Sequence, residues 1–272
     1  MDDIEPVTFT DPARELVELC ESLREGMSNT LVSGEIHLAE LFEVNPSSLE
    51  FFEIIFTIMQ RITEVKGLVN CLPMDADYKQ EMIGHLLLIS SAFSVNSMRK
   101  EWIHAVNGLI NKENVNSFKA ISSQVRERVK YKNLSNKEVN EIIADVEQLK
   151  ILLGERQISD NDFIRQALIE GLGRVEFRLK RLKWVGWGYT FDGLREVIAA
   201  YVMLERSGVS AEKNPDAEAI LRKVKAVLKK IEEKLQPVKS VAETGDLIIK
   251  LYGYGSALTD GAAGVIALLG NT

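Results

Sequence analysis

Apolar residues recur along this chain at intervals of three and four, the spacing that places them on one face of an α-helix. Two segments show the pattern most clearly. The first stripe consists of Ile164, Leu168, Leu172, Val175, Leu179 and Leu182. The second follows Pro215 and consists of Ile220, Val224, Val227, Ile231, Leu235 and Val238. Each segment is predicted to be an amphipathic helix that packs through its stripe.

Helix start signals recur as well. A short side chain with an oxygen atom caps amides of the first turn, and a carboxylate three residues later caps in return. This spacing occurs at Ser47 with Glu50, at Ser135 with Glu138 and at Ser159 with Asp162. Proline, which suits a first helical turn, follows a capping residue at Asp11-Pro12 and at Asn214-Pro215. Because strand signals are weak throughout, the sequence predicts an all-α, multi-helix bundle.

The length of the chain and its charge distribution favour two packed helical subdomains. A chain of 272 residues exceeds the usual size of one domain. Residues 1–74 carry 4 Lys or Arg against 14 Asp or Glu, whereas residues 151–272 carry 18 against 16. The helical pattern breaks at Gly154, close to where the net charge of the chain changes from negative to positive. We therefore expect an acidic N-terminal bundle over residues 1–154 and a basic C-terminal region over residues 155–272, which includes an apolar, glycine-rich tail.

Cysteine usage indicates the cellular compartment. Cys20 and Cys71 are far apart, and no apolar targeting segment is evident at the N-terminus. Both thiols are expected to be free and buried, as in a reducing compartment, so the sequence predicts a cytoplasmic protein.

One short motif combines arginine and histidine. Arg99 and His104 are separated by four residues, and on one helix they would flank the same edge. This R-x4-H pattern resembles the signature of the HEPN ribonucleases, all-helical proteins whose metal-independent site combines residues of two protomers. The resemblance implies that Arg99 stabilises charge on the phosphorane and that His104 activates or orients the ribose hydroxyl. The alternative is an exposed arginine beside His104 and Trp102 on a half-buried helical face.

Other catalytic and cofactor signatures are missing or incomplete. Glu101 and His104 have the i, i+3 spacing of di-metal bundles, but no second pair accompanies them. The sequence contains no HExxH, Cys-x-x-Cys, P-loop or G-x-S-x-G motif. No cofactor and no metal is expected, and the protein is predicted not to be an enzyme.

A basic and aromatic segment is the most distinctive local composition. Its residues are candidates for contact with a protein partner because cationic and aromatic side chains together suit anions and interfaces. The candidate partner-binding residues are Arg174, Arg178, Arg181, Trp184, Trp187 and Tyr189. The alternative is a purely structural role, in which the stretch from Trp184 to Tyr189 forms a bend anchored by its aromatic rings.

The C-terminal segment, residues 246–272, is apolar and rich in small residues. Three roles stay open for it: docking onto its own bundle, oligomerisation, or contact with a membrane.

These patterns together predict a non-enzymatic helical interaction protein, a scaffold or regulatory subunit that self-associates as a homo-oligomer or binds a protein partner. One alternative is a HEPN-like ribonuclease, a toxin or defence effector that acts on RNA through Arg99 and His104. A second alternative is a membrane-active effector that acts through residues 246–272.

Overall fold

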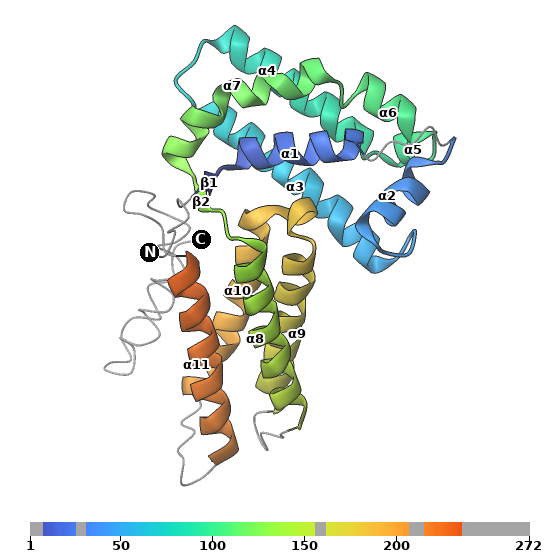
Figure 1. Ribbon diagram of the computed structural model, residues 1–272. Coiled ribbons are helices and arrows are strands. Elements are labelled where there is room, and N and C mark those ends of the chain that lie inside the picture. Colours follow the sequence, from blue (N-terminus) through green and yellow to red (C-terminus); the bar gives the residue numbers. More distant parts are fainter. Residues whose placement is uncertain (1–7, 26–30, 156–161, 207–214, 236–272) are drawn as a thin grey trace, which may run out of the picture. The chain divides into compact units, whose positions relative to one another are not determined.

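The computed structural model describes residues 8–25, 31–155, 162–206 and 215–235, and it confirms the all-α, multi-helix prediction. Its helices form two compact units. The first, which we name the α1–α7 unit, consists of residues 9–131 together with residues 181–189. The second, which we name the α8–α11 unit, takes the other described residues, which are Thr8, residues 132–180 and those after Tyr189. Figure 1 shows the helices of both units.

The α1–α7 unit is built around contacts of α1, α3, α4 and α7 (Figure 1). Helix α1 packs against α7 and α3, and α4 packs against both α3 and α7. The core is continuous through the large buried side chains of Leu16, Phe51 and Phe118. The elements are β1 (Phe9–Thr10), α1 (Pro12–Glu25), α2 (Gly34–Phe42), α3 (Leu49–Cys71), α4 (Ala76–Ala92), α5 (Val95–Met98), α6 (Trp102–Gly108) and α7 (Lys112–Arg128). The strand β2 (Tyr131–Lys132) spans the boundary, because Lys132 belongs to the other unit.

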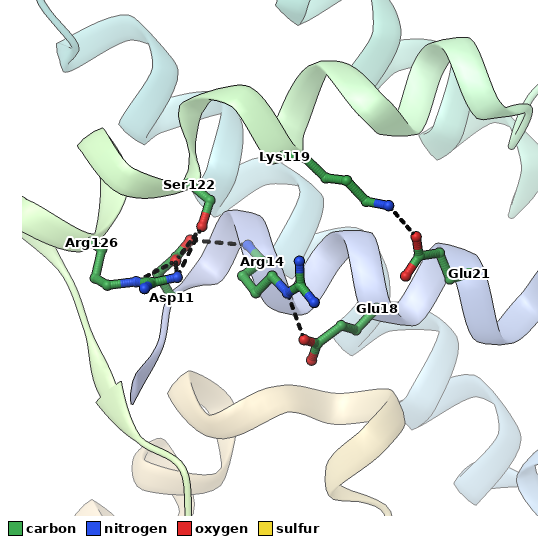
Figure 2. Close-up of polar contacts among 7 residues, drawn as sticks. All are labelled: Asp11, Arg14, Glu18, Glu21, Lys119, Ser122 and Arg126. Atoms are coloured by element: carbon green, nitrogen blue, oxygen red, sulfur yellow. Dashed lines mark hydrogen bonds and ion pairs between the residues drawn. The ribbon is translucent and has the colours of Figure 1, made fainter. Parts of the chain in front are cut away.

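Asp11 confirms the predicted start of α1 and also ties that helix to α7 (Figure 2). Its carboxylate accepts a hydrogen bond from the amide of Arg14 at 2.9 Å, which is the capping contact. The same buried carboxylate accepts from the hydroxyl of Ser122 at 2.6 Å and from Nε of Arg126 at 3.1 Å. A buried charge with several donors is compensated rather than left unsatisfied. Two further ion pairs are Arg14 with Glu18 and Lys119 with Glu21.

The predicted cap of α3 is displaced by one residue. Ser48, not Ser47, accepts the hydrogen bond of the first turn, from the amide of Phe51 at 3.1 Å. Ser47 instead has a positive φ of 56° and its hydroxyl donates to the carboxylate of Glu35. The two adjacent serines have the same capping chemistry, so only the backbone conformation distinguishes them.

The α8–α11 unit confirms most of both predicted stripes. Helix α8 (Asn136–Glu155) packs against α9 (Asp162–Lys180) and against α11 (Pro215–Leu235) (Figure 1). Its own start is a reciprocal cap, because the amide of Ser135 donates to Glu138 at 2.8 Å and the amide of Glu138 donates to the hydroxyl of Ser135 at 3.3 Å. Helix α10 (Leu182–Arg206) passes close to α9 at Gly171, where an added Cβ would lie 3.0 Å from Val197.

The stripes differ from their predictions in two details. Helix α9 ends at Lys180, so Leu182 belongs to the next helix. In α11 the buried position falls on Leu228 instead of on Val227, while Ile220, Val224 and Ile231 are buried as expected. The two last members of the second stripe, Leu235 and Val238, lie outside the described side chains. The predicted caps at Ser159 and Asn214 also lie outside the described residues.

The chain does not divide into units at the break near Gly154. That position lies in the last turn of α8, whose partner α9 belongs to the same unit. The chain passes from the α1–α7 unit to the α8–α11 unit between residues 131 and 132. It returns to the α1–α7 unit for residues 181–189 and then leaves it again. Sequence composition marks the end of a helix near residue 154, but the α8–α9 packing continues across it.

Candidate functional site

Helix α3 is apolar on two of its faces. One face carries the buried residues Phe51, Ile54, Ile58, Ile62, Val65 and Val69. The opposite face carries four large apolar side chains that remain exposed, Leu49, Phe52, Phe56 and Met59. Their spacing of three, four and three residues places all four on one side of the helix. We name this set the α3 stripe.

The exposure of the α3 stripe is substantial. Leu49 is 82% exposed, Phe52 48%, Phe56 62% and Met59 38%. Single exposed apolar residues are ordinary on soluble proteins, but a row of adjacent ones marks an interaction surface more often than chance placement. Neighbouring elements of the same unit carry further exposed apolar side chains, among them Ile36, Leu87 and Leu88.

This surface was missed by sequence reasoning, although a signal for it exists. Residues 49–62 are apolar on nearly every side of the predicted helix. A helix that is apolar all round is usually buried all round. Here one side has no covering element among the described residues of its unit, so the same pattern produces both a core face and an exposed stripe.

A buried polar cluster lies elsewhere in the α1–α7 unit, at the bend of α10. Gly186 interrupts that helix with a φ of 76°, a left-handed conformation that favours glycine. Arg61 of α3 donates a hydrogen bond to the carbonyl of Trp184, before the bend. Glu15 of α1 accepts from the amide of Trp187, after the bend, at 3.3 Å. Arg61 and Glu15 form a buried ion pair, with Nη2 of Arg61 3.6 Å from Oε2 of Glu15. Arg61 thus holds the start of the turn and Glu15 holds its end.

The carboxyl of Glu15 is poorly compensated in this cluster. Its Oε1 atom is buried and has no hydrogen-bond partner. Burial raises the pKa of Glu15 to about 7, against the opposing influence of Arg61 and of the Trp187 amide. The ion pair with Arg61 lowers the pKa of Glu15, whereas desolvation raises it. Desolvation prevails because only one of the two carboxyl oxygens is paired with Arg61.

The six predicted partner-binding residues are distributed over both units. Arg174 and Arg178 are on α9 of the α8–α11 unit, and Arg181 begins the segment that belongs to the α1–α7 unit. Trp184 and Trp187 are buried, at 7% and 4% exposure, and Tyr189 is half-buried. Trp184 packs on Phe42 with ring centroids 5.1 Å apart. The aromatic stretch thus forms an anchored bend, while partner contact through these six residues remains a prediction that no observation tests.

Arg99 and His104 do not share a helix, contrary to the expected geometry. Arg99 ends α5, and α6 begins only at Trp102. Between them the backbone pairs with an extended segment, since the amide of Gly34 donates to the carbonyl of Lys100 at 2.8 Å. The imidazole of His104 is 72% exposed and lies 3.3 Å from the carboxylate of Glu101. Arg99 is also exposed. RNA cleavage by this pair remains a prediction from the resemblance.

Both cysteine thiols are free, as the sequence predicts, but only one of them is buried. Cys20 is buried in α1, and burial raises its pKa to about 12, whereas Cys71 at the end of α3 is exposed. The prediction that Cys71 is buried is wrong because its position on α3 turns away from the core.

A groove of about 420 Å³ lies within the α8–α11 unit, between α8 and α11. Its walls are mainly apolar, with Leu149, Leu152 and Val227 among them, and an ion pair between Lys230 and Asp145 crosses one side at 2.5 Å. Among the described residues, no three His, Cys, Asp or Glu side chains gather closely enough to hold a metal ion.

None of the helices in the described part of the chain has the length and apolar character needed to cross a membrane. The apolar tail at residues 246–272, on which the membrane and oligomerisation alternatives depend, lies outside the described residues. Comparison of the chain with protein-family models, with curated proteins and with solved structures finds no match.

Proposed function

We propose that this protein is a non-enzymatic helical interaction protein, a scaffold or regulatory subunit, that binds a protein partner through the α3 stripe. One observation carries the proposal: Leu49, Phe52, Phe56 and Met59 form an exposed apolar row on a helix whose opposite face already fills the core. Most of the surface of Leu49 and Phe56 is therefore left uncovered by its own unit, and the helix that carries the row is held in place by its buried face.

Rigid presentation favours binding because little conformational freedom is lost when the partner docks. Covering the exposed part of Phe56 alone contributes about 1 to 2 kcal/mol of apolar burial. Four such side chains in one row make an anchor of the kind found at the centre of helix-mediated interfaces. The amphipathic helix of a partner is the element that fits such a row most directly.

The proposal is tested by the native mass of the full chain purified from its own cell, for the wild type and two variants. Phe56→Ser removes a stripe residue that is 62% exposed. Phe163→Ser removes a phenylalanine of the α8–α11 unit that is 63% exposed, so it is a matched control. Because both side chains are mostly exposed, neither change should alter stability by more than about 0.5 kcal/mol.

We expect the wild type and Phe163→Ser to be recovered in a complex of defined mass, and Phe56→Ser to be recovered as the free chain. A wild type that is a monodisperse monomer without a partner would contradict the proposal. A complex that survives Phe56→Ser unchanged would contradict the assignment to the α3 stripe.

A further inference from the structure

The groove between α8 and α11 has apolar walls that the two helices leave partly uncovered. Ile151 of α8 is 61% exposed, and Leu152 of α8 and Val227 of α11 are half-buried. Val227 belongs to the apolar stripe of α11, and it is only half-buried because it faces the groove. At about 420 Å³ the groove is as large as many ligand pockets, so it has room for several apolar side chains.

Charged side chains stand at the two ends of this groove, with mainly apolar ones between them. Lys230 and Asp145 form an ion pair at the end where α11 finishes. Glu155 and Lys223 line the opposite end, because α8 and α11 run antiparallel (Figure 1). Each end carries one charge of each sign, so neither an anion nor a cation is favoured. The middle of the groove suits an apolar polypeptide segment with few charges.

The same chain carries a segment of this chemistry after α11. Residues 246–272 contain nine Leu, Ile or Val against three charged residues, Asp246, Lys250 and Asp260. An apolar segment is costly to leave in water, and covering it against other apolar surface is favourable. We infer that the groove between α8 and α11 is the docking site of residues 246–272 of the same chain, independently of the α3 stripe.

The connection between α11 and this segment is long enough for such docking. Helix α11 ends at Leu235, which is five residues, or about 8 Å of helix, beyond Lys230 at the near end of the groove. The groove follows α8 from Asp145 to Glu155, about 15 Å of helix. Residues 236–245 can span up to about 35 Å when extended. The segment can therefore reach every part of the groove.

The covalent link favours this segment over a separate occupant. A segment tethered through a short linker meets its site at an effective concentration in the millimolar range. A second copy of the chain, or another molecule of equal affinity, would need a higher free concentration to displace it. Residues 246–272 are thus the occupant that both the apolar chemistry and the tether support.

The inference is tested first by cleavage of the full chain with chymotrypsin under native conditions. The protease cuts after the leucines and tyrosines of residues 246–272, and docking protects these sites because cleavage requires their release. Ile151→Glu places a charge in the apolar middle of the groove. Met203→Glu is the matched control, because Met203 is 54% exposed on α10 of the same unit and does not line the groove.

We expect cleavage within residues 246–272 to be at least tenfold faster in Ile151→Glu than in the wild type, and unchanged in Met203→Glu. Phe56→Ser, in the α3 stripe, should also leave the rate unchanged. Cleavage within α8 and α11 should be the same in all four proteins. That comparison separates release of the segment from unfolding of the unit.

The location of the segment is tested by a photoreactive phenylalanine analogue at position 151 or at position 203 of the full chain. An equal mixture of ordinary and isotope-labelled chains distinguishes crosslinks within one chain from crosslinks between two. We expect crosslinks from position 151 to peptides of residues 246–272 with the same label, and none at the same level from position 203.

The inference stands only if both measurements agree. Equal cleavage of the wild type and Ile151→Glu would overturn it, and so would the absence of a crosslink from position 151 to residues 246–272. Crosslinks between chains of different label would make a second copy the occupant, and crosslinks to another molecule would make that molecule the occupant. Faster cleavage in Phe56→Ser but not in Ile151→Glu would place the segment on the α3 stripe, which also contradicts the inference.

Discussion

Replacing Gly186 by alanine is expected to destabilise the α1–α7 unit severely. At the φ of 76° found there, an added Cβ would lie 2.7 Å from Oε2 of Glu15 and 2.8 Å from Nε of Arg61. The left-handed backbone costs about 1 to 2 kcal/mol for a residue with a side chain, and overpacking adds about 1 to 3 kcal/mol. The expected loss in the free energy of unfolding is thus about 2 to 5 kcal/mol.

The measurement is urea denaturation followed by tryptophan fluorescence. All three tryptophans, Trp102, Trp184 and Trp187, belong to the α1–α7 unit, so the signal reports on that unit. Gly84→Ala is the control, because an added Cβ on α4 would meet nothing within 4 Å. It is expected to stabilise the unit by about 0.5 to 1 kcal/mol. Equal stability of the Gly186→Ala variant and the wild type would show that the bend is not held as described.

The stability of the same unit is expected to fall as pH rises from about 4.5 to about 7, through the contribution of Glu15. Its pKa is raised from 4.5 to about 7 by burial in the folded state. Between these values the folded chain binds more protons than the unfolded chain, so raising the pH favours unfolding. The full contribution of Glu15 is present below pH 4.5 and is lost above pH 7. Its size is about 3 kcal/mol for a shift of this extent.

Glu15→Gln isolates this contribution because glutamine keeps the shape of the protonated side chain but does not titrate. The difference in unfolding free energy between the wild type and the variant should change by about 3 kcal/mol between pH 4.5 and pH 7.5. Arg61, Glu64 and Glu18, the other charged groups that act on Glu15, remain in both proteins and cancel in the difference. A difference that does not depend on pH would mean that Glu15 titrates normally.

The fold class and most of the described helix starts could be predicted because they depend on local rules. The buried stripe from Ile164 to Leu179 follows from spacing alone, and the caps at Asp11 and Ser135 follow from short-range hydrogen bonds. The division into units could not be predicted in this way. It depends on residues 181–189 joining elements far away in the sequence, and no local pattern records that choice.

The candidate site was the least predictable part. The ion pair of Glu15 with Arg61 joins residues of two different helices, and only the folded core brings them together. The α3 stripe has a sequence signal, because the apolar residues among 49–62 cover most of the circumference of the helix, but that signal does not say which side remains uncovered. The sequence left two roles open for Trp184 and Trp187, contact with a partner or anchoring of a bend, and in the structure both are buried at the bend.

The most direct test of the α3 stripe is site-specific photo-crosslinking in the cell of origin. A photoreactive phenylalanine analogue would replace either Phe56 or Phe163, two residues of nearly equal exposure. The proposed interaction predicts one discrete crosslinked species from position 56 and none at the same level from position 163. No crosslink at position 56, or the same crosslinks at both positions, would contradict a partner at the α3 stripe.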